Sequence, residues 1–552
     1  MKKHWVQSKT YFIAAVLILF LLSFFLHFWK FPEIPNGFYY DEVAVGYNAY
    51  CVAVSGADEH GVKYPLFFKS FGNYHEPVIV YVLAPMVKMF GLEKWVVRLP
   101  GGVFLVLASI AFFFLVAKYV RNRWICLGGA FAFSILPWVF PVGRVGIGGY
   151  TAMLLGMIAG CYFLLDAVSR KSFTSAVLSG GFCAFAMYAH NIGRPMTAVM
   201  LVCFVIAFNV LLIKRWKVFA LFVASYVIFL MPMIMAVIDN PKCMTARFSG
   251  MSVWNDGAPL FEVIKRILER YMDYFSPAFL FIQGDYELRH NAGSSGELYV
   301  FMAPFIIAGF YFIIRRFRRN PYCRFMLLAI LSYPAAAVLT MEKMHSTRCM
   351  NGAPFWCMLT VMGFYFIWTC RQKFRIAVIA VLCFSAIEIS SYFVNYFGRY
   401  AVASRGVFYA PFAETLELSF KNLPANGTLY VSDSVFFHPV DKSFKPYWYV
   451  YFLFYGKVAP ETYQKTGIPE YIRAYDGKIC NPGILIRMNS RIGVDSAGNP
   501  IAIVNDEPVP ANSKLIHKIP LSAGSVRFFE IYQVDCGFSG KPQLGMDDIE
   551  TN

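Results

Sequence analysis

The sequence is short of charged residues. Only 15% of its 552 residues are Asp, Glu, Lys or Arg, whereas soluble domains carry about a quarter. Apolar residues make up 58% and aromatic residues 18%. This composition excludes an ordinary soluble protein, and it predicts that the apolar runs cross a membrane.

The sequence also lacks a CxxC motif, a Cys/His spacing typical of a metal module, an internal repeat and a low-complexity tract. Many of its 13 cysteines lie inside apolar runs, where a thiol packs as a small hydrophobic group. The last two, Cys480 and Cys536, follow residue 395. We expect them to form a disulfide if that region lies outside the cytoplasm.

Eleven stretches are apolar enough to predict transmembrane helices, because about 20 apolar residues span the hydrocarbon core. The first resembles a signal peptide, but no small-residue cleavage site follows it, so we interpret it as an uncleaved helix. The predicted spans are 11–29, 97–119, 124–141, 151–168, 173–189, 196–213, 218–237, 299–314, 323–340, 352–369 and 376–394.

The net charge of +17 suggests nucleic-acid binding at first sight, but the basic residues cluster between the apolar runs, where they orient helices. Alternate loops carry these clusters, which predicts that their side is cytoplasmic, as is the N-terminus. The loops 30–96 and 238–298 and the tail then lie outside. The clusters are Lys2, Lys3 and Lys9; Lys118, Arg121 and Arg123; Arg170 and Lys171; Lys214, Arg215 and Lys217; Arg315, Arg316, Arg318 and Arg319; and Arg371, Lys373 and Arg375.

Two further segments are predicted to lie at the outer membrane interface. Residues 77–91 are apolar but short for a crossing, and they contain Pro85 and Lys88. Residues 260–271 place apolar side chains at helical spacing with charged residues between them, which is typical of an interfacial amphipathic helix.

The chain changes character near residue 395, where Pro, Gly, Asn and Asp become frequent. The runs GTLYVSDSV, ICNPGILIRM and VRFFEIYQVD are typical of strands. We therefore predict an all-α membrane domain over residues 1–395 and an extracytoplasmic α/β domain over residues 396–552.

Acidic residues and histidines gather in the first outer loop. Asp41 and Glu42 follow the first helix, and Asp58-Glu59-His60 and His75-Glu76 come later. Such groups at a membrane surface are candidates for base catalysis or metal binding. The alternative is a solvated loop with helix caps.

The motifs GFYYDEVAVGYNAY, DEHG…PLFFKSFGNYHEP, VVRLPG and HSTRCMNGAPF resemble bacterial GT-C glycosyltransferases of the protein O-mannosyltransferase and aminoarabinose (lipid A) transferase group. The resemblance covers residues 1–395. It implies a polyprenyl-phosphate sugar donor bound at the outer leaflet and transfer to a protein, lipid or glycan acceptor with inversion. It also implies that Asp41 is the general base, because a carboxylate takes the proton of an acceptor hydroxyl, with Glu42 and Glu76 as further catalytic candidates.

A leaving phosphate needs cations, and the fork of arginine binds phosphate oxygens in pairs. The short outer loops at 142–150, 190–195 and 341–351 offer three such side chains, Arg144, Arg194 and Arg348. The alternative for each is an arginine that reaches toward lipid headgroups. His190 and His345 lie beside two of them and are further candidates.

The resemblance leaves metal dependence open, because some relatives use a divalent metal and others do not. Asp41, Glu76 and His60 offer ligand atoms, but their spacing defines no site. The sequence therefore predicts a multi-pass glycosyltransferase of a bacterial inner membrane without naming its metal, sugar or acceptor.

Two other functions compete with this one. A transporter or flippase of lipid-linked sugars would share the many helices and the outer arginines, but transporters usually have paired halves with ionisable residues near the midplane. A sensor whose tail binds a ligand would not need Asp41, Glu42 and Glu76 together.

Overall fold

The structure is a computed structural model that describes residues 2–147, 149–370, 374–432, 435, 447–475, 478–479, 481–488, 490–494, 500–504, 513–521, 528–535 and 538–539. It contains two compact units. The first comprises Met1–Pro35 and Lys63–Ser404, and the second comprises Asn36–Val62 and Arg405–Asn552.

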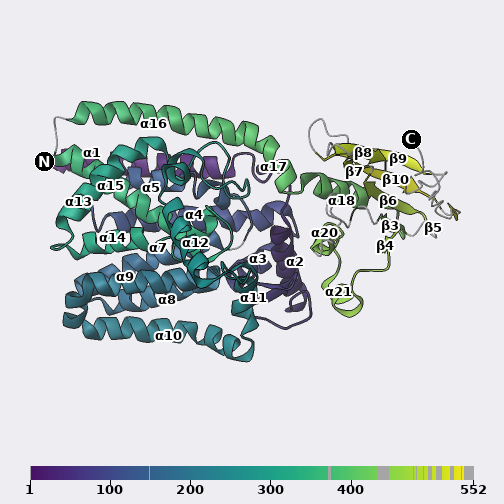
Figure 1. Ribbon diagram of the computed structural model, residues 1–552, viewed down its shortest axis with the longest axis horizontal. Helices are drawn as coiled ribbons and strands as arrows, with labels where there is room; N and C mark the ends of the chain where they lie inside the picture. The colour runs from purple at the N-terminus through teal and green to yellow at the C-terminus, as the bar shows by residue number, and fades with distance from the viewer. Residues whose placement is uncertain are drawn as a thin grey trace. The chain divides into compact units, whose positions relative to one another are not determined.

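The first unit is almost entirely helical (Figure 1). Eight of its helical segments are long and apolar enough to cross a membrane, so the chain is a multi-pass membrane protein. The eight are Tyr11–Phe28, Lys94–Val116, Tyr150–Arg170, Gly193–Lys214, Trp216–Asp239, Pro321–Leu339, Ser346–Thr369 and Arg375–Val407.

The helices of this unit are joined by short 3₁₀- and π-helical turns and one β-hairpin. The helices are α1 (Lys2–Phe28), α3 (Pro77–Phe90), α4 (Lys94–Val116), α5 (Arg123–Ser134), α6 (Phe140–Gly143), α7 (Tyr150–Arg170), α8 (Phe173–Ala189), α9 (Gly193–Lys214), α10 (Trp216–Asp239), α11 (Lys242–Met251), α12 (Leu260–Asp273), α13 (Ala303–Arg316), α14 (Pro321–Ser332), α15 (Ala353–Cys370), α16 (Arg375–Asn395) and α17 (Ala401–Val407). The turns are η1 (Ala278–Ile282), η2 (Val300–Met302), η3 (Ala337–Leu339), η4 (Ser346–Gly352) and η6 (Tyr396–Tyr400), and the hairpin strands are β1 (Phe68–Ser70) and β2 (Asn73–His75).

Three of the predicted spans coincide with helices that are not among these eight segments. The span 124–141 becomes α5, which ends at Ser134 because Pro137 disfavours helix in the residues before it. The span 299–314 becomes α13 of 14 residues, and the span 173–189 becomes α8 of 17 residues. Whether these three cross the membrane stays a prediction.

Small residues let the long helices pack closely. A Cβ on Gly363 of α15 would lie 1.8 Å from the carbonyl oxygen of Phe305 on α13. A Cβ on Gly156 of α7 would lie 2.8 Å from the backbone of α8. Glycine at such crossings brings backbones together, as is usual between helices in lipid.

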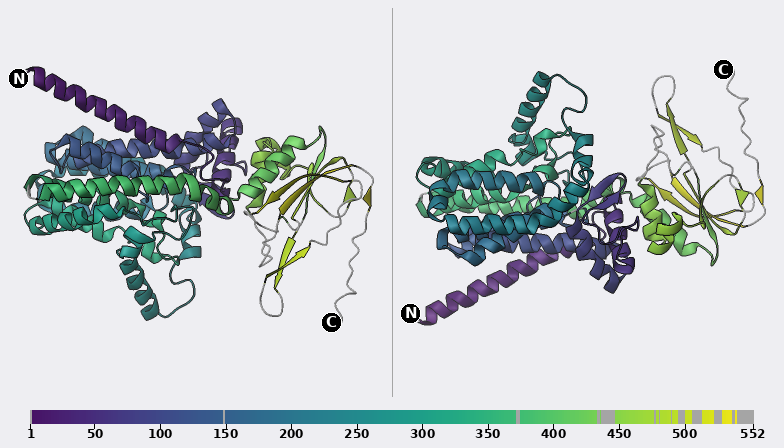
Figure 2. Two further views of the ribbon diagram at one scale, coloured as in Figure 1. Left: turned by 90° about the horizontal axis from the view of Figure 1, so that it is seen from above. Right: turned by 90° about the horizontal axis from the view of Figure 1, so that it is seen from below.

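Two helices expose apolar surface as membrane contact would require. In Figure 2, α1 diverges from the other helices toward the N-terminus, and only 11% of its span is buried. The amphipathic α12 buries Arg270 but leaves Phe261 78% and Leu268 60% exposed. This exposure agrees with the predicted interfacial position of α12.

The second unit contains a five-stranded mixed sheet in the order β4-β3-β6-β10-β9. Strand β3 is parallel to β4 and β6, and β10 is antiparallel to β6 and β9. The helices are α2 (Tyr40–Ser55), α18 (Ala410–Asn422), α20 (Trp448–Tyr455) and α21 (Pro460–Thr466), and the strands are β3 (Thr428–Val431), β4 (Ile472–Ala474), β5 (Lys478–Ile479), β6 (Gly483–Met488), β7 (Ser490–Val494), β8 (Pro500–Val504), β9 (Lys514–Pro520), β10 (Phe528–Val534) and β11 (Phe538–Ser539). The predicted strands at the three tail motifs are confirmed as β3, β6 and β10.

The division into units differs from the predicted domain boundary at residue 395. The last long helical segment continues to Val407, and the chain passes from the first unit to the second between Ser404 and Arg405. In addition, residues 36–62 of the first outer loop belong to the second unit. Cys480 and Cys536 lie outside the described residues, so their disulfide stays a prediction.

Candidate functional site

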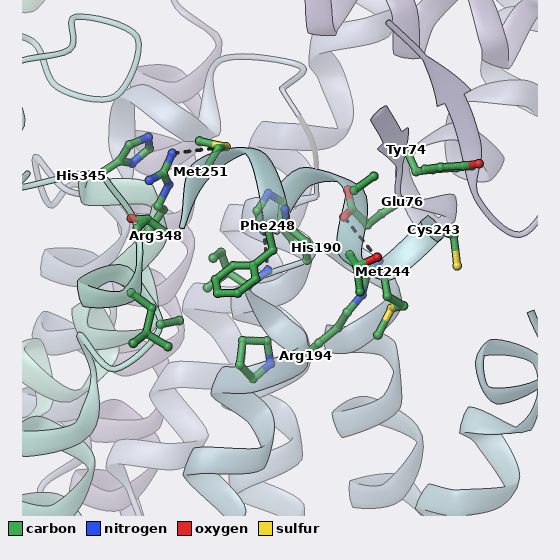
Figure 3. Close-up of a pocket in the computed structure, with 18 of the residues that line it drawn as sticks. Tyr74, Glu76, His190, Arg194, Cys243, Met244, Phe248, Met251, His345 and Arg348 are labelled. Atoms are coloured by element: carbon green, nitrogen blue, oxygen red, sulfur yellow. Dashed lines mark hydrogen bonds and ion pairs between the residues drawn. The ribbon is translucent and has the colours of Figure 1, made fainter. Parts of the chain in front are cut away.

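The first unit contains a pocket of about 350 Å³ in which residues from five regions of the sequence meet. Figure 3 shows Arg348 and His345 on one side of it and Glu76 with Arg194 on the other. Its lining residues are Tyr74, Glu76, Tyr150, His190, Asn191, Ile192, Arg194, Pro195, Cys243, Met244, Thr245, Ala246, Phe248, Met251, Ala336, Leu339, Thr340, His345 and Arg348.

Glu76 and Arg194 form a buried ion pair in this pocket. Glu76 precedes Pro77, which begins α3, and Arg194 lies in the first turn of α9. Their closest atoms, Oε1 and Nη2, are 3.4 Å apart, and the two side chains are only 5% and 9% exposed. The Arg194 Nε has no hydrogen-bond partner among the described residues. Arg194 therefore keeps a donor for a further acceptor in the pocket.

Arg348 lies in η4 and is paired with a more accessible carboxylate. Its Nη2 is 2.7 Å from Oε2 of Glu342, whose side chain is 53% exposed. The same Oε2 is 3.1 Å from Nε2 of His345. The hydrogen bond from His345 and the charge of Arg348 lower the pKa of Glu342 to about 2. Burial in turn lowers the pKa of His345 to about 4, so its ring is neutral at pH 7.

His190 terminates α8 and is held in a fixed orientation. Its Nδ1 accepts a hydrogen bond from the backbone N–H of Ile192 at 3.2 Å, so the proton of the neutral ring lies on Nε2. The ring packs against Tyr150 with the ring centroids 3.9 Å apart. His190 thus lies beside Arg194 as a rigid, oriented side chain of the pocket wall.

Arg144 does not line this pocket. Its Nη1 donates to the carbonyl oxygens of Leu26 at 2.8 Å and His27 at 2.6 Å, which belong to the last turn of α1. Its Nη2 and Nε donate to the carbonyls of Trp29 and Ile34. The last carbonyls of a helix have no N–H donor within the helix, and here the guanidinium of Arg144 donates to them. Because all five N–H donors are used, the side chain stabilises the fold.

Arg98 on α4 makes a similar contact nearby. Its Nη1 donates to the carbonyl oxygens of Pro32 and Pro35, each at 2.7 Å, and the side chain is fully buried. Together Arg98 and Arg144 fix the segment that leaves α1. No sequence motif distinguished these two arginines from those of the pocket.

The acidic pair Asp41-Glu42 lies in the second unit, in the first turn of α2. The Oε2 of Glu42 accepts the backbone N–H of Tyr39 at 3.0 Å, and Glu42 is fully buried. Asp41 is half-buried, and its carboxylate has no hydrogen bond or ion pair with the residues that the structure describes. Glu42 therefore caps the helix, while Asp41 is available to an outside partner.

The backbone before Asp41 is held firmly within the second unit. The N–H of Phe38 donates to the carbonyl oxygen of Phe408 at 2.6 Å, and the Tyr451 hydroxyl donates to the carbonyl oxygen of Phe38. Gly37 has a φ of +102°, and a Cβ there would lie 2.3 Å from the Phe408 carbonyl oxygen. Only glycine fits this position, which explains the glycine of the GFYYDE motif.

His60 lies in the second unit and interacts with a carboxylate of the same loop. Its Nε2 is 3.5 Å from Oε1 of Glu59, which also accepts a hydrogen bond from the Tyr449 hydroxyl at 2.8 Å. The ring is 42% exposed. Among the described residues, no metal-ligand cluster includes His60, Asp41 or Glu76.

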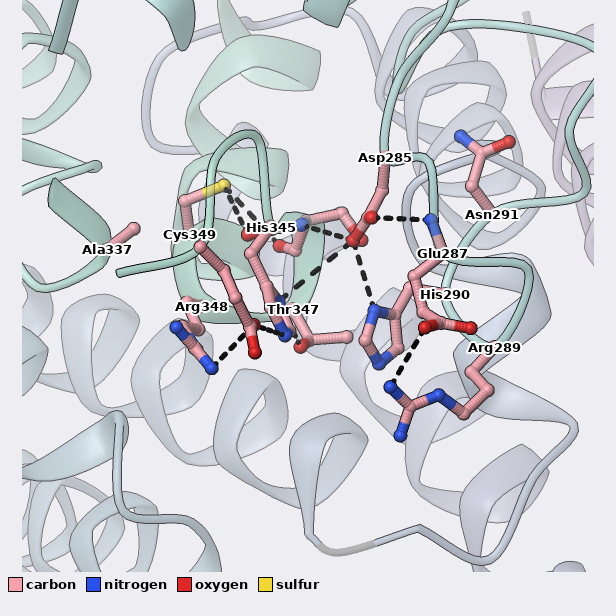
Figure 4. A network of polar contacts seen from close by, with 12 residues as sticks. Asp285, Glu287, Arg289, His290, Asn291, Ala337, His345, Thr347, Arg348 and Cys349 are labelled. Carbon is pink, nitrogen blue, oxygen red and sulfur yellow. Dashed lines mark hydrogen bonds and ion pairs between the residues drawn. The ribbon is translucent and has the colours of Figure 1, made fainter. Parts of the chain in front are cut away.

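A second polar network lies next to the pocket and was missed in the sequence (Figure 4). Asp285 and His290 come from the loop between η1 and η2, and they approach His345. Ligand atoms of the three residues all lie within 4.8 Å of one another. The two loops are separated by more than fifty residues in the chain, so no local spacing reveals the cluster.

The structure thus brings five of the predicted site residues into one pocket. These are Glu76, His190, Arg194, His345 and Arg348. Arg144 is placed elsewhere in the same unit, and Asp41, Glu42 and His60 belong to the second unit. The roles predicted for all of them stay predictions.

Solved structures resemble this fold, although no protein-family model and no curated sequence matches the chain. ArnT from Cupriavidus metallidurans bound to undecaprenyl phosphate matches over 96% of this chain and 98% of its own, with a TM-score of 0.52 at 11% identity. The oligosaccharyltransferase of Archaeoglobus fulgidus tethered with an acceptor peptide matches over 91% of this chain and 75% of its own, with a TM-score of 0.49 at 12% identity. The chain therefore shares the GT-C fold of ArnT, which confirms the fold that the sequence resemblance implies.

Proposed function

We propose that this protein transfers a sugar from a polyprenyl-phosphate donor to a protein, lipid or glycan acceptor, with inversion at the anomeric carbon. The observation that supports this most strongly is the pocket that two buried arginines line, one from α9 and one from η4, within a fold shared with ArnT. ArnT was solved with undecaprenyl phosphate bound. A polyprenyl-phosphate donor presents the same chemical group, a phosphate ester on an isoprenoid chain.

In this proposal Arg194 and Arg348 bind the phosphate of the donor. Arginine suits the task because its planar fork places two N–H groups on two phosphate oxygens. Without a donor, the carboxylates Glu76 and Glu342 pair with these guanidinium groups. The predicted phosphate contact of Arg144 has no support from the geometry, since its donors are used by backbone carbonyls.

Asp41 is the general base of the proposed reaction. It removes the proton of the acceptor hydroxyl as the new glycosidic bond forms at the anomeric carbon and the bond to the phosphate breaks. The phosphate departs as an anion, so a strong general acid is not needed. Of the acidic pair, Glu42 is used as a helix cap, which favours Asp41 as the base.

The test is transfer of labelled sugar from the polyprenyl-phosphate donor in membranes that contain the natural acceptor. Mass spectrometry of surface glycans and lipids with and without the gene first identifies that acceptor. Asp41→Asn should then lower turnover by about 100- to 10,000-fold while donor binding survives. Glu33→Gln, an exposed carboxylate of the same outer loop, is the matched control. Wild-type transfer by Asp41→Asn, Glu42→Gln and Glu76→Gln would overturn the proposed reaction.

We also propose that the basic clusters face the cytoplasm and that the second unit is extracytoplasmic in an inner membrane. The positive-inside rule supports this orientation. Cysteine labelling in intact cells tests it at Glu470 and Arg318, which are both exposed. A Cys383→Ser background is suitable, because Cys383 is the exposed one among the ten described free cysteines. If Arg318→Cys is labelled from outside and Glu470→Cys is not, the orientation is the reverse of the one proposed.

A further inference from the structure

A further pocket of the first unit is lined by arginines at the end of α13. Its volume is about 460 Å³. The last turn of α13 supplies Arg315 and Arg316, the turn that follows supplies Arg319, and α15 supplies Phe366. No Asp or Glu lines this pocket, so its chemistry suits an anion.

Two of the guanidinium groups are held in place by aromatic side chains of α13. Nη1 of Arg315 donates to the Tyr311 hydroxyl at 2.7 Å, and the guanidinium carbon of Arg316 lies 4.3 Å from the centroid of the Phe312 ring. Such contacts orient a cation but supply no net negative charge. Among the residues that the structure describes, Arg315, Arg316 and Arg319 form no ion pair with a carboxylate. The three charges therefore remain for an outside anion.

The turn after α13 brings the third arginine to the same pocket. The carbonyl oxygen of Arg316 accepts the backbone N–H of Arg319 at 3.1 Å and that of Asn320 at 2.9 Å. Asn320 then caps α14, because its side chain accepts the backbone N–H of Tyr322 at 2.9 Å. The backbone that carries Arg319 is thus fixed on both sides.

The pocket continues into an apolar face of α13. Ile307 and Ile314 are 71% and 59% exposed, and Tyr311, which lines the pocket, lies between them on the same helical face. On the side toward α15, the rings of Phe312 and Phe366 are 5.6 Å apart between their centroids. A cationic pocket that adjoins an exposed apolar helix face has the amphipathic character of a phospholipid, whose headgroup is charged and whose chains are apolar.

We propose that this pocket binds an anionic phospholipid, with the headgroup phosphates on Arg315, Arg316 and Arg319 and the acyl chains along the exposed face of α13. Basic pockets between transmembrane helices bind such headgroups, and the arginine fork places two N–H groups on two phosphate oxygens. Three guanidinium groups can neutralise two phosphates, so a lipid with two phosphates should bind more tightly than a lipid with one. The pocket shares no residue with the proposed donor pocket, so this site depends neither on sugar transfer nor on the orientation of the chain.

The test is native mass spectrometry of the full-length protein in detergent, titrated separately with diphosphatidylglycerol, phosphatidylglycerol and phosphatidylcholine. Affinity should fall in that order. Loss of one arginine near a membrane surface should weaken binding of an anionic lipid about fivefold. The combined variant Arg315→Ala/Arg316→Ala/Arg319→Ala should therefore bind diphosphatidylglycerol about 100-fold more weakly, whereas its affinity for phosphatidylcholine should not change.

The control is Lys214→Ala/Arg215→Ala/Lys217→Ala, which removes the same number of positive charges from another basic cluster. None of these three residues lines the pocket, so the control should bind diphosphatidylglycerol as the wild type does. If both triple variants lose the same affinity, overall charge and not the pocket attracts the lipid, and the proposal is wrong.

A competition on the wild-type protein requires no variant that folds poorly. Inorganic phosphate should not displace diphosphatidylglycerol, because it lacks the chains that contact α13. If phosphate does displace the lipid, the pocket binds a free anion and the proposal fails. It also fails if phosphatidylcholine binds the wild type as tightly as diphosphatidylglycerol, and equal binding of the two anionic lipids would contradict the two-phosphate arrangement.

Discussion

Two regions of the helical unit bury arginines in opposite ways. At the end of α1, Arg144 donates every N–H to backbone carbonyls and is fully buried. At the pocket, Arg194 and Arg348 each contact one carboxylate and border a cavity. Burial alone therefore does not separate a structural arginine from a binding one, but the use of its donors does.

The difference follows from what each guanidinium replaces. The carbonyls at the end of α1 would be buried without partners if Arg144 were absent, and an unpaired buried group costs about 1 to 3 kcal/mol. By contrast, Glu76 lines a cavity, and the side chain of Glu342 is 53% exposed, so water can reach the partners of the pocket arginines. We therefore expect the pocket arginines to change partners at a lower cost than Arg144.

The largest effect should come from Arg144→Ala. It leaves four or more carbonyls without donors, so we expect a loss of at least about 3 kcal/mol in unfolding free energy. The measurement is the fraction of monodisperse protein that survives heating in detergent. Arg144→Lys should restore little, since an ammonium has no fork, and the exposed Arg318→Ala should behave as wild type. If the Arg144→Ala protein is as stable as wild type and loses only donor binding, Arg144 is a binding residue like the pocket arginines, and the contrast is wrong.

The next effect should come from Arg348→Ala, in which the fold survives and binding does not. A charge-assisted hydrogen bond contributes about 1.5 to 3 kcal/mol, so affinity for a polyprenyl phosphate should fall about 10- to 100-fold. Quenching of intrinsic fluorescence by the lipid in detergent measures this, and high salt should weaken the wild type more than the variant. If the affinity is unchanged and the melting temperature is lower, Arg348 stabilises the fold as Arg144 does and does not bind the phosphate.

The sequence anticipated the membrane region better than the site. Apolar length and basic clusters predict the long helices because lipid demands continuous apolar segments. They predict too long a helix at α5, which ends at Ser134 before Pro137, and at α13, which starts only at Ala303. The strands β3, β6 and β10 were predicted from residue preference and turn signals, whereas their order in the sheet depends on long-range pairing.

The site was predicted only in part, for a physical reason. Glu76, Arg194, His190, His345 and Arg348 were identified because each lies in a loop between apolar runs. The sequence ranked Arg144 with the pocket residues, since a short outer loop carries it too. Which carbonyls a guanidinium reaches is decided by tertiary packing. Asp285 and His290 were missed for the same reason, because their partner His345 lies far along the chain.

A smaller effect would sharpen the contrast at Glu76. Glu76→Gln removes the charge that pairs with Arg194 but keeps the shape. Released from this competition, Arg194 should bind a phosphate more tightly, by about 1 kcal/mol or roughly fivefold. The same fluorescence assay measures it, with the exposed Glu33→Gln as the matched control. Weaker binding would mean that Glu76 orients Arg194 rather than competing for it.

The smallest effect tests a third kind of buried arginine, in the sheet of the second unit. Arg487 on β6 and Glu530 on β10 are paired across the strands, with Nε and Oε2 2.9 Å apart. Burial opposes ionisation of Glu530, but hydrogen bonds from Tyr532, Arg487 and Lys518 outweigh it and lower the carboxyl pKa. A carboxyl whose pKa is lower in the folded state stabilises the fold above its unfolded pKa, near 4.3, and loses that contribution as pH falls. Glu530→Gln should therefore lower the free energy of local opening of β6 and β10 by about 1 kcal/mol at pH 7, which is measured as faster hydrogen exchange in peptides that cover these strands. The difference from wild type should shrink as pH falls toward 4. A difference that stays constant with pH would mean that shape, not charge, joins these strands, and Arg487 would then resemble Arg144 more than the arginines of the pocket.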